Sequence, residues 1–136
     1  MNKIEDIIEK EGYYISTSVG NSMLPFLRER KDTIVIQKRE QYKKFDVVLY
    51  KRKGNYVLHR IIKVLPETFH IRGDNCYYDE YVKHNEIIGV MVECYRGEKK
   101  VNLNGILYKF YVYTRDYLYP FRLLLKKFQN KLKQFK

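Results

Sequence analysis

Ser22, His59 and Asp74 are the residues of this chain whose types and order could carry out a chemical reaction. Ser22 lies in the segment 20–25 (GNSMLP), where flexible residues precede the hydroxyl and apolar residues follow it. A serine hydroxyl is a poor nucleophile at its ordinary pKa, so it needs a base that takes its proton. His59, in the segment 57–62 (VLHRII), is the best candidate for that base, and Asp74 follows at a glycine-assisted turn, where a carboxylate could orient the imidazole. These residue types could therefore supply a nucleophile, its base and an acid that orients the base.

The segments around these residues resemble the type I signal peptidase and LexA-like clan of serine peptidases. The match is to the branch that uses histidine as its base, found in archaea, the endoplasmic reticulum and spore-forming bacteria. That branch carries Gly-x-Ser-Met-x-Pro, Gly-Asp-Val-Val, His-Arg-Ile/Val and Lys-Gly-Asp-Asn in this order, followed by a hydrophobic strand. The corresponding segments here are GNSMLP at 20–25, FDVV at 45–48, HRI at 59–61, RGDN at 72–75 and IIGV at 87–90.

The resemblance implies an all-β peptidase fold and hydrolysis of a peptide bond through an acyl-enzyme. Ser22 would attack the scissile carbonyl, His59 would move the proton, and the backbone N–H of Ser22 would help to stabilise the oxyanion. In the family a second aspartate after the Gly-Asp-Asn box often serves as the triad acid, which leaves Asp79 as an alternative to Asp74. The implied partner is a peptide or protein substrate bound as an added strand, and no cofactor is implied.

Two features depart from the family pattern. At two turn positions where the family often has glycine, this chain has Lys31 before Asp32, and Lys44 or Phe45 before Asp46. Signal peptidases also carry a transmembrane segment before the serine box, whereas this chain opens with the charged segment 1–6 (MNKIED). We therefore expect the catalytic domain in the cytoplasm, peripheral on the inner face of the membrane, and a role other than removal of secretory signal peptides.

The hydrophobic pattern predicts a mainly β fold, with curled antiparallel sheets of the signal-peptidase type, a short N-terminal helix and a helical C-terminal tail. Helical spacing of isoleucines predicts a helix at 3–11 that ends at Gly12. Alternation along 56–64 places His59 on one face and Arg60 on the other, where we expect a structural ion pair. The predicted strands cover 13–18, 33–37, 46–50, 56–64, 68–72 and 86–95.

Charge divides the chain into a domain at 1–100 and a tail at 101–136. The tail holds eight Lys or Arg against one acid, Asp116, for a net charge of +7 out of the +11 of the whole chain. Cys76 and Cys94 have neither a Cys-x-x-Cys partner nor a histidine at ligand spacing, so we expect no disulfide and no metal site.

The last segment, Phe121–Lys136, combines apolar residues at helical spacing with lysines on the remaining surface. Such a basic amphipathic helix could bind an anionic membrane, dock on an acidic partner or pack on its own domain. Lysine density and terminal aromatic residues favour the membrane. Nucleic-acid binding is not expected, because lysine dominates over arginine and no reading motif accompanies the charge.

Two functions of different classes fit these patterns. The first is a serine endopeptidase that cleaves a peptide or leader sequence through Ser22 and His59. The alternative is a catalytically silent, peptidase-like β module that binds peptide, or binds membrane through its tail. The presence of both Ser22 and His59 favours the enzyme, because a binding module needs neither residue.

Overall fold

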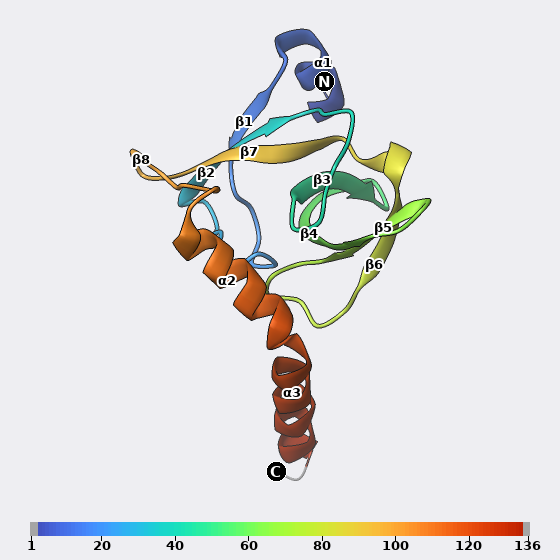
Figure 1. Ribbon diagram of the computed structural model, residues 1–136, viewed down its shortest axis with the longest axis vertical. Coiled ribbons are helices and arrows are strands. Elements are labelled where there is room, and N and C mark those ends of the chain that lie inside the picture. The colour runs from blue at the N-terminus through green and yellow to red at the C-terminus, as the bar shows by residue number, and fades with distance from the viewer. Residues whose placement is uncertain (1–2, 135–136) are drawn as a thin grey trace. The chain divides into compact units, whose positions relative to one another are not determined.

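The computed structural model describes residues 3 to 134, which divide into two compact units at Leu103 and Asn104. The first unit, here called the β unit, holds a short helix and the strands, and the second, the tail unit, consists of helices (Figure 1). The division falls close to the boundary expected at residue 100. Phe135 and Lys136 of the expected tail helix lie outside the described residues.

Within the described residues, the β unit is one eight-stranded antiparallel sheet in the order β1-β2-β7-β3-β4-β5-β6, with β8 paired to β7. The mainly antiparallel β fold expected from the sequence is therefore confirmed. The strands are β1 (Tyr14–Thr17), β2 (Asp32–Gln37), β3 (Val47–Arg52), β4 (Asn55–Val64), β5 (Thr68–Arg72), β6 (Glu80–Lys83), β7 (Gly89–Arg96) and β8 (Lys99–Lys100).

Two of these strands, β6 and β8, were not expected. Both are short and rich in charged residues, so their own composition carries little strand signal, and each forms by pairing with a longer neighbour. The last predicted strand also begins later than expected. The residues before it form a short 3₁₀ helix, η1 (His84–Glu86), and β7 starts only at Gly89.

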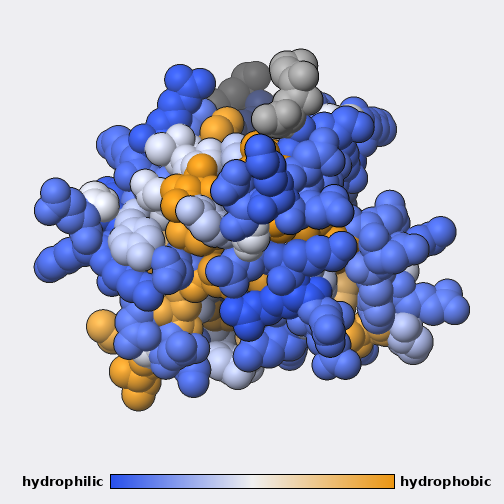
Figure 2. Space-filling view, turned by 90° about the horizontal axis from the view of Figure 1, so that it is seen from above, coloured by the Kyte–Doolittle hydropathy of each residue, from blue (hydrophilic) through white to orange (hydrophobic). Residues whose placement is uncertain are grey.

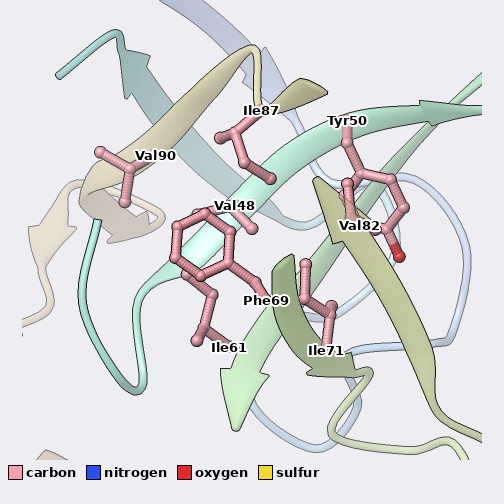
Figure 3. Close-up of a cluster of buried hydrophobic side chains, with 8 residues drawn as sticks. All are labelled: Val48, Tyr50, Ile61, Phe69, Ile71, Val82, Ile87 and Val90. Carbon is pink, nitrogen blue, oxygen red and sulfur yellow. The ribbon is translucent and has the colours of Figure 1, made fainter. Parts of the chain in front are cut away.

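Strands β7 and β3 pair over a short register in which Val48 lies opposite Val90 and Leu49 lies opposite Gly89. Strands β3 to β6 wrap around a buried cluster that also takes in residues before and within β7 (Figure 3). Tyr50 belongs to this cluster and is 1% exposed, so its ring is core while its hydroxyl must find a polar partner. The cluster consists of Val48, Tyr50, Ile61, Phe69, Ile71, Val82, Ile87 and Val90.

The β3–β4 hairpin fixes which residues of β3 lie beside His59. Lys53 and Gly54 form a two-residue turn with φ of 52° and 83°, and positive φ at both positions matches the right-handed twist of paired strands. This turn sets the register in which Val48 lies opposite His59. Tyr50, two residues along β3, is then a diagonal neighbour of His59 on the same face.

The helix α1 (Ile4–Glu11) forms as expected and ends at Gly12, whose φ of 88° gives the left-handed C-terminal cap. Its Glu5 side chain pairs with Lys51 at 2.9 Å and accepts a hydrogen bond from Tyr56, which ties α1 to the β3–β4 hairpin. Phe45, at a position where the resembled family often has glycine, has a φ of 75° and so keeps the left-handed backbone of that turn at some cost in strain.

The tail unit contains α2 (Ile106–Tyr117) and α3 (Tyr119–Gln134). A helical tail was expected over 101–136, but a helix was bounded only from Phe121 onward, and α3 begins two residues earlier than that. Within residues 3–134, no helix combines the length and hydropathy needed to cross a membrane. From the side shown in Figure 2, hydrophilic side chains cover most of the molecule and the hydrophobic ones form small patches between them.

Candidate active site

Ser22 lies in a loop between β1 and β2 that is anchored by apolar side chains on one side of it. Met23, Phe26 and Leu27 are all buried, and the Leu27 N–H bonds to the Met23 carbonyl at 2.9 Å. Asp32 is fully buried at the end of the loop and accepts the Arg28 N–H at 2.8 Å as well as the Arg28 guanidinium. Ser22 itself stays partly exposed.

His59 sits on the buried face of β4, with 2% of its surface exposed. Its Nδ1 lies 3.2 Å from the Tyr50 hydroxyl and 3.6 Å from Oε1 of Glu80, and its Nε2 lies 4.0 Å from Sγ of Cys76. These are the hydrogen-bond and ion-pair partners of His59 among residues 3–134. The imidazole is thus held from its Nδ1 side.

The contacts at Nδ1 determine the tautomer that fits this site. The Tyr50 hydroxyl donates to Oε1 of Glu80 at 2.9 Å, so it can only accept from Nδ1. The direct distance of 3.6 Å from Nδ1 to Glu80 is too long for a hydrogen bond. A neutral His59 therefore carries its proton on Nδ1, which leaves the lone pair of Nε2 available to accept a proton.

Burial lowers the pKa of His59 below its ordinary value of 6.5, and the negative charge of Glu80 partly opposes this shift. His59 is therefore neutral at pH 7, the state that a general base requires. Burial and the neighbouring Glu80 also raise the pKa of Tyr50, so that its hydroxyl keeps the proton it donates. Arg52 completes the group with a 2.6 Å contact from its guanidinium to Glu80.

Gly73 allows the Ser22 loop and β4 to come together. A Cβ at this position would lie 2.7 Å from the Ser22 carbonyl oxygen, 2.7 Å from Sγ of Cys76 and 3.0 Å from Cδ2 of His59. Any larger residue would collide with all three groups. The next residues strengthen the contact, because the Asn75 N–H donates to the Ser22 carbonyl at 2.8 Å.

Neither acid expected from the sequence contacts His59. Asp74 binds the Arg60 guanidinium through both carboxylate oxygens, at 2.9 Å each, in a buried ion pair. Asp79 binds Arg72 at 2.6 Å and His70 at 2.8 Å. Each of these two aspartates forms an ion pair with an arginine, and the carboxylate nearest to the imidazole is that of Glu80. The expected ion pair of Arg60 on the opposite face of β4 is confirmed.

Ser22 and His59 line the same cleft, which has a volume of about 310 Å³. Its walls include the edge strand β1, the Ser22 loop, and side chains of β4 and the loop before β6. In the part of the chain that the structure describes, no hydrogen bond joins the Ser22 hydroxyl to His59. Catalytic hydrogen bonds often tighten only when substrate is bound, so this arrangement remains compatible with a nucleophile and its base.

Cys76 is a second nucleophilic side chain near the imidazole. Its thiol lies 3.8 Å from the Ser22 carbonyl and 4.0 Å from Nε2 of His59. Burial raises the pKa of this thiol, which keeps it protonated and poorly reactive. Cys76 is therefore a buried packing residue beside His59 and the Ser22 loop. Cys94 is also buried and unbridged. Within residues 3–134, no three His, Cys, Asp or Glu side chains converge as metal ligands.

Sequence reasoning missed Tyr50 and Glu80. Tyr50 could have been found from the hairpin turn. A two-residue turn at Lys53 and Gly54 fixes the strand register, which makes Tyr50 a neighbour of His59. No comparable signal existed for Glu80, which reaches the site through β6 and its pairing with β5. Comparison of the chain with models of known protein families and with characterised proteins gives no match.

Proposed function

We propose that this chain is a serine endopeptidase of the signal-peptidase type, with Ser22 as the nucleophile and His59 as the general base. One observation carries the proposal: a buried, neutral imidazole is held at Nδ1, with Nε2 unprotonated, and lines the same cleft as Ser22. A histidine that only filled the core would need neither a fixed tautomer nor a place in a cleft beside a hydroxyl.

In the proposed reaction, Ser22 Oγ attacks the scissile carbonyl and Nε2 of His59 takes its proton. The proton then passes to the leaving amine, and a water molecule, activated by the same nitrogen, hydrolyses the acyl-enzyme. Tyr50 and Glu80 act as positioning residues: they hold Nδ1–H, and the carboxylate stabilises the imidazolium that forms. The Ser22 N–H is the oxyanion donor that the chain offers most directly.

The proposed substrate is an extended segment of a peptide or leader sequence. Strand β1 is an edge of the sheet, and Ser16 and Thr17 of this strand line the cleft. An edge strand has unpaired backbone groups that an extended peptide can pair with, so the substrate would add as a further strand. The modest volume of about 310 Å³ favours small side chains near the cut.

The rival proposal is a silent binding module with the same fold. It draws support from the missing hydrogen bond between Ser22 and His59. A peptidase assay separates the two: a complex mixture of peptides is incubated with the full chain and the new termini are read by mass spectrometry. The endopeptidase proposal expects cleavage by wild type and by Cys76→Ser, and none by Ser22→Ala or His59→Ala. Binding of peptides without new termini in wild type would favour the silent module.

A further inference from the structure

The tail unit exposes a row of large apolar side chains that has no role in the proposed peptidase site. These side chains, here called the apolar stripe, are between 50% and 83% exposed. Exposed apolar surface of this extent on helices usually marks a binding surface. The apolar stripe consists of Ile106, Leu107, Phe110, Tyr117, Phe121, Leu124, Leu125, Phe128 and Leu132.

The stripe continues across the junction of α2 and α3. The Leu118 N–H bonds to the Thr114 carbonyl at 2.9 Å, and the Arg122 N–H bonds to the Leu118 carbonyl at 3.0 Å, so helical hydrogen bonds lie on both sides of Pro120, which has no N–H to donate. Successive members of the stripe lie one, three, four or seven residues apart, spacings that bring them onto one side of a helix. Both helices therefore contribute to one apolar face.

Basic residues accompany this face and acids are nearly missing. Residues 119–134 contain five Lys or Arg (Arg122, Lys126, Lys127, Lys131 and Lys133) and no Asp or Glu. Long basic side chains can lay their apolar stems along a lipid surface and keep the charge in the headgroup region. This composition complements an anionic bilayer, in which an apolar acyl region lies beneath negatively charged headgroups.

We infer that the tail unit lies in the plane of an anionic lipid bilayer, with the apolar stripe at the acyl boundary and the basic residues among the headgroups. A second copy of the chain is a poorer occupant, because two α3 helices that bury their stripes together would bring like charges alongside each other with no acid to pair them. The inference concerns attachment and does not depend on the activity of Ser22.

The test is sedimentation of the full-length protein with lipid vesicles. We expect binding to phosphatidylcholine vesicles that contain phosphatidylglycerol, and much weaker binding to phosphatidylcholine alone. Raising the salt from about 0.1 M to about 1 M shortens the Debye length from about 10 Å to about 3 Å, so the bound fraction should fall. No sedimentation with the anionic vesicles at low salt, or equal sedimentation with both vesicle types, would overturn the inference.

Three variants separate the contributions. Phe121→Ala, Leu124→Ala and Phe128→Ala together keep helix propensity and should weaken binding at least about 10-fold. Lys127→Glu, Lys131→Glu and Lys133→Glu together should weaken it about 100-fold or more. The control carries the same charge change in the β unit, at the exposed residues Lys10, Lys38 and Lys63, and should bind nearly as well as wild type. Circular dichroism checks that each variant stays folded.

Two results with these variants would contradict the inference. If the control loses as much binding as the tail lysine variant, the overall charge of the protein binds the vesicles and the tail has no special part. If the wild type forms a lipid-independent dimer that the alanine variant abolishes, the apolar stripe belongs to a second copy of the chain.

Discussion

The Tyr50 hydroxyl lies 3.2 Å from Nδ1 of His59 and donates its own proton to Glu80 across 2.9 Å. A tyrosine thus stands between the proposed base and the nearest carboxylate, which lies 3.6 Å from the imidazole. Because Tyr50 is held in the hydrophobic cluster and cannot readily lose its proton, it fixes the imidazole tautomer without becoming charged.

Replacement of Tyr50 by Phe tests this arrangement. The ring would still fill the core, but Nδ1–H would lose its acceptor and Glu80 would lose a donor. We expect kcat/KM to fall about 10-fold or more with little change in KM, because the change acts on proton transfer. The free energy of unfolding should fall by about 1–3 kcal/mol, the usual cost of leaving buried polar groups unpaired. A Tyr50→Phe variant with the wild-type rate would contradict this role.

Glu80→Gln should alter the pH dependence of activity. The base works only when it is neutral, and burial lowers the pKa of His59. Activity should therefore increase with pH below pH 6.5, the acid limb of the profile, and reach its plateau by neutral pH. Glu80 raises the pKa of His59, so its removal should move the limb to lower pH and also reduce the plateau rate. The measurement is kcat/KM against pH, with Asp79→Asn as the matched control. A limb that moves with Asp79→Asn and stays with Glu80→Gln would reverse the assignment.

Asp74→Asn should act on stability. Asp74 and Arg60 form a buried ion pair in which both side chains are at most 5% exposed. Removing the negative charge takes the ion-pair partner from a buried guanidinium, and breaking a buried pair typically costs about 3–5 kcal/mol. Urea unfolding measures this loss. If Asp74→Asn unfolds like wild type but has lost its activity, Asp74 is a triad acid after all.

Gly73→Ala should disturb the site itself. Its new methyl group would lie within 3.0 Å of His59 and closer still to the Ser22 carbonyl, so the serine loop must move away from β4. We expect a large loss of kcat/KM and only a small decrease in the free energy of unfolding. Gly97→Ala, in the turn between β7 and β8, is a control for lost stability: no atom lies within 4 Å of its new methyl group, but the φ of 63° strains an alanine there. Equal losses of activity in both variants would show that close approach at Gly73 is unimportant.

Hydrophobic patterning predicted much of the fold, because the long strands carry β-branched residues and α1 has a periodic apolar face ended by Gly12. It missed β6, a strand of four residues, Glu80–Lys83, whose pairing with β5 depends on tertiary context. It predicted a helical tail over 101–136 but gave no bounds for α2, where dense aromatic residues show no clear helical period.

The site was predicted to the extent that local segments define it. Ser22 and His59 lie in segments whose local sequence motifs singled them out, and both residues line the cleft. The acid could not be chosen from sequence, because Asp74, Asp79 and Glu80 lie within seven positions of one another and only the placement of arginines separates them. Arg60 forms an ion pair with Asp74 and Arg72 forms one with Asp79, whereas Glu80 lies beside His59.

The most direct test of the central claim is labelling with a serine-directed fluorophosphonate probe, followed by mapping of the modified residue by mass spectrometry. The probe phosphonylates an activated serine and releases fluoride, so its rate reports on the nucleophile without any knowledge of the substrate. We predict modification at Ser22 in wild type and in Cys76→Ser, none in Ser22→Ala, and a rate at least about 100-fold slower in His59→Ala. Modification of Ser22→Ala at the wild-type rate, or no modification of the folded wild type, would contradict the claim that Ser22 is the nucleophile of a peptidase.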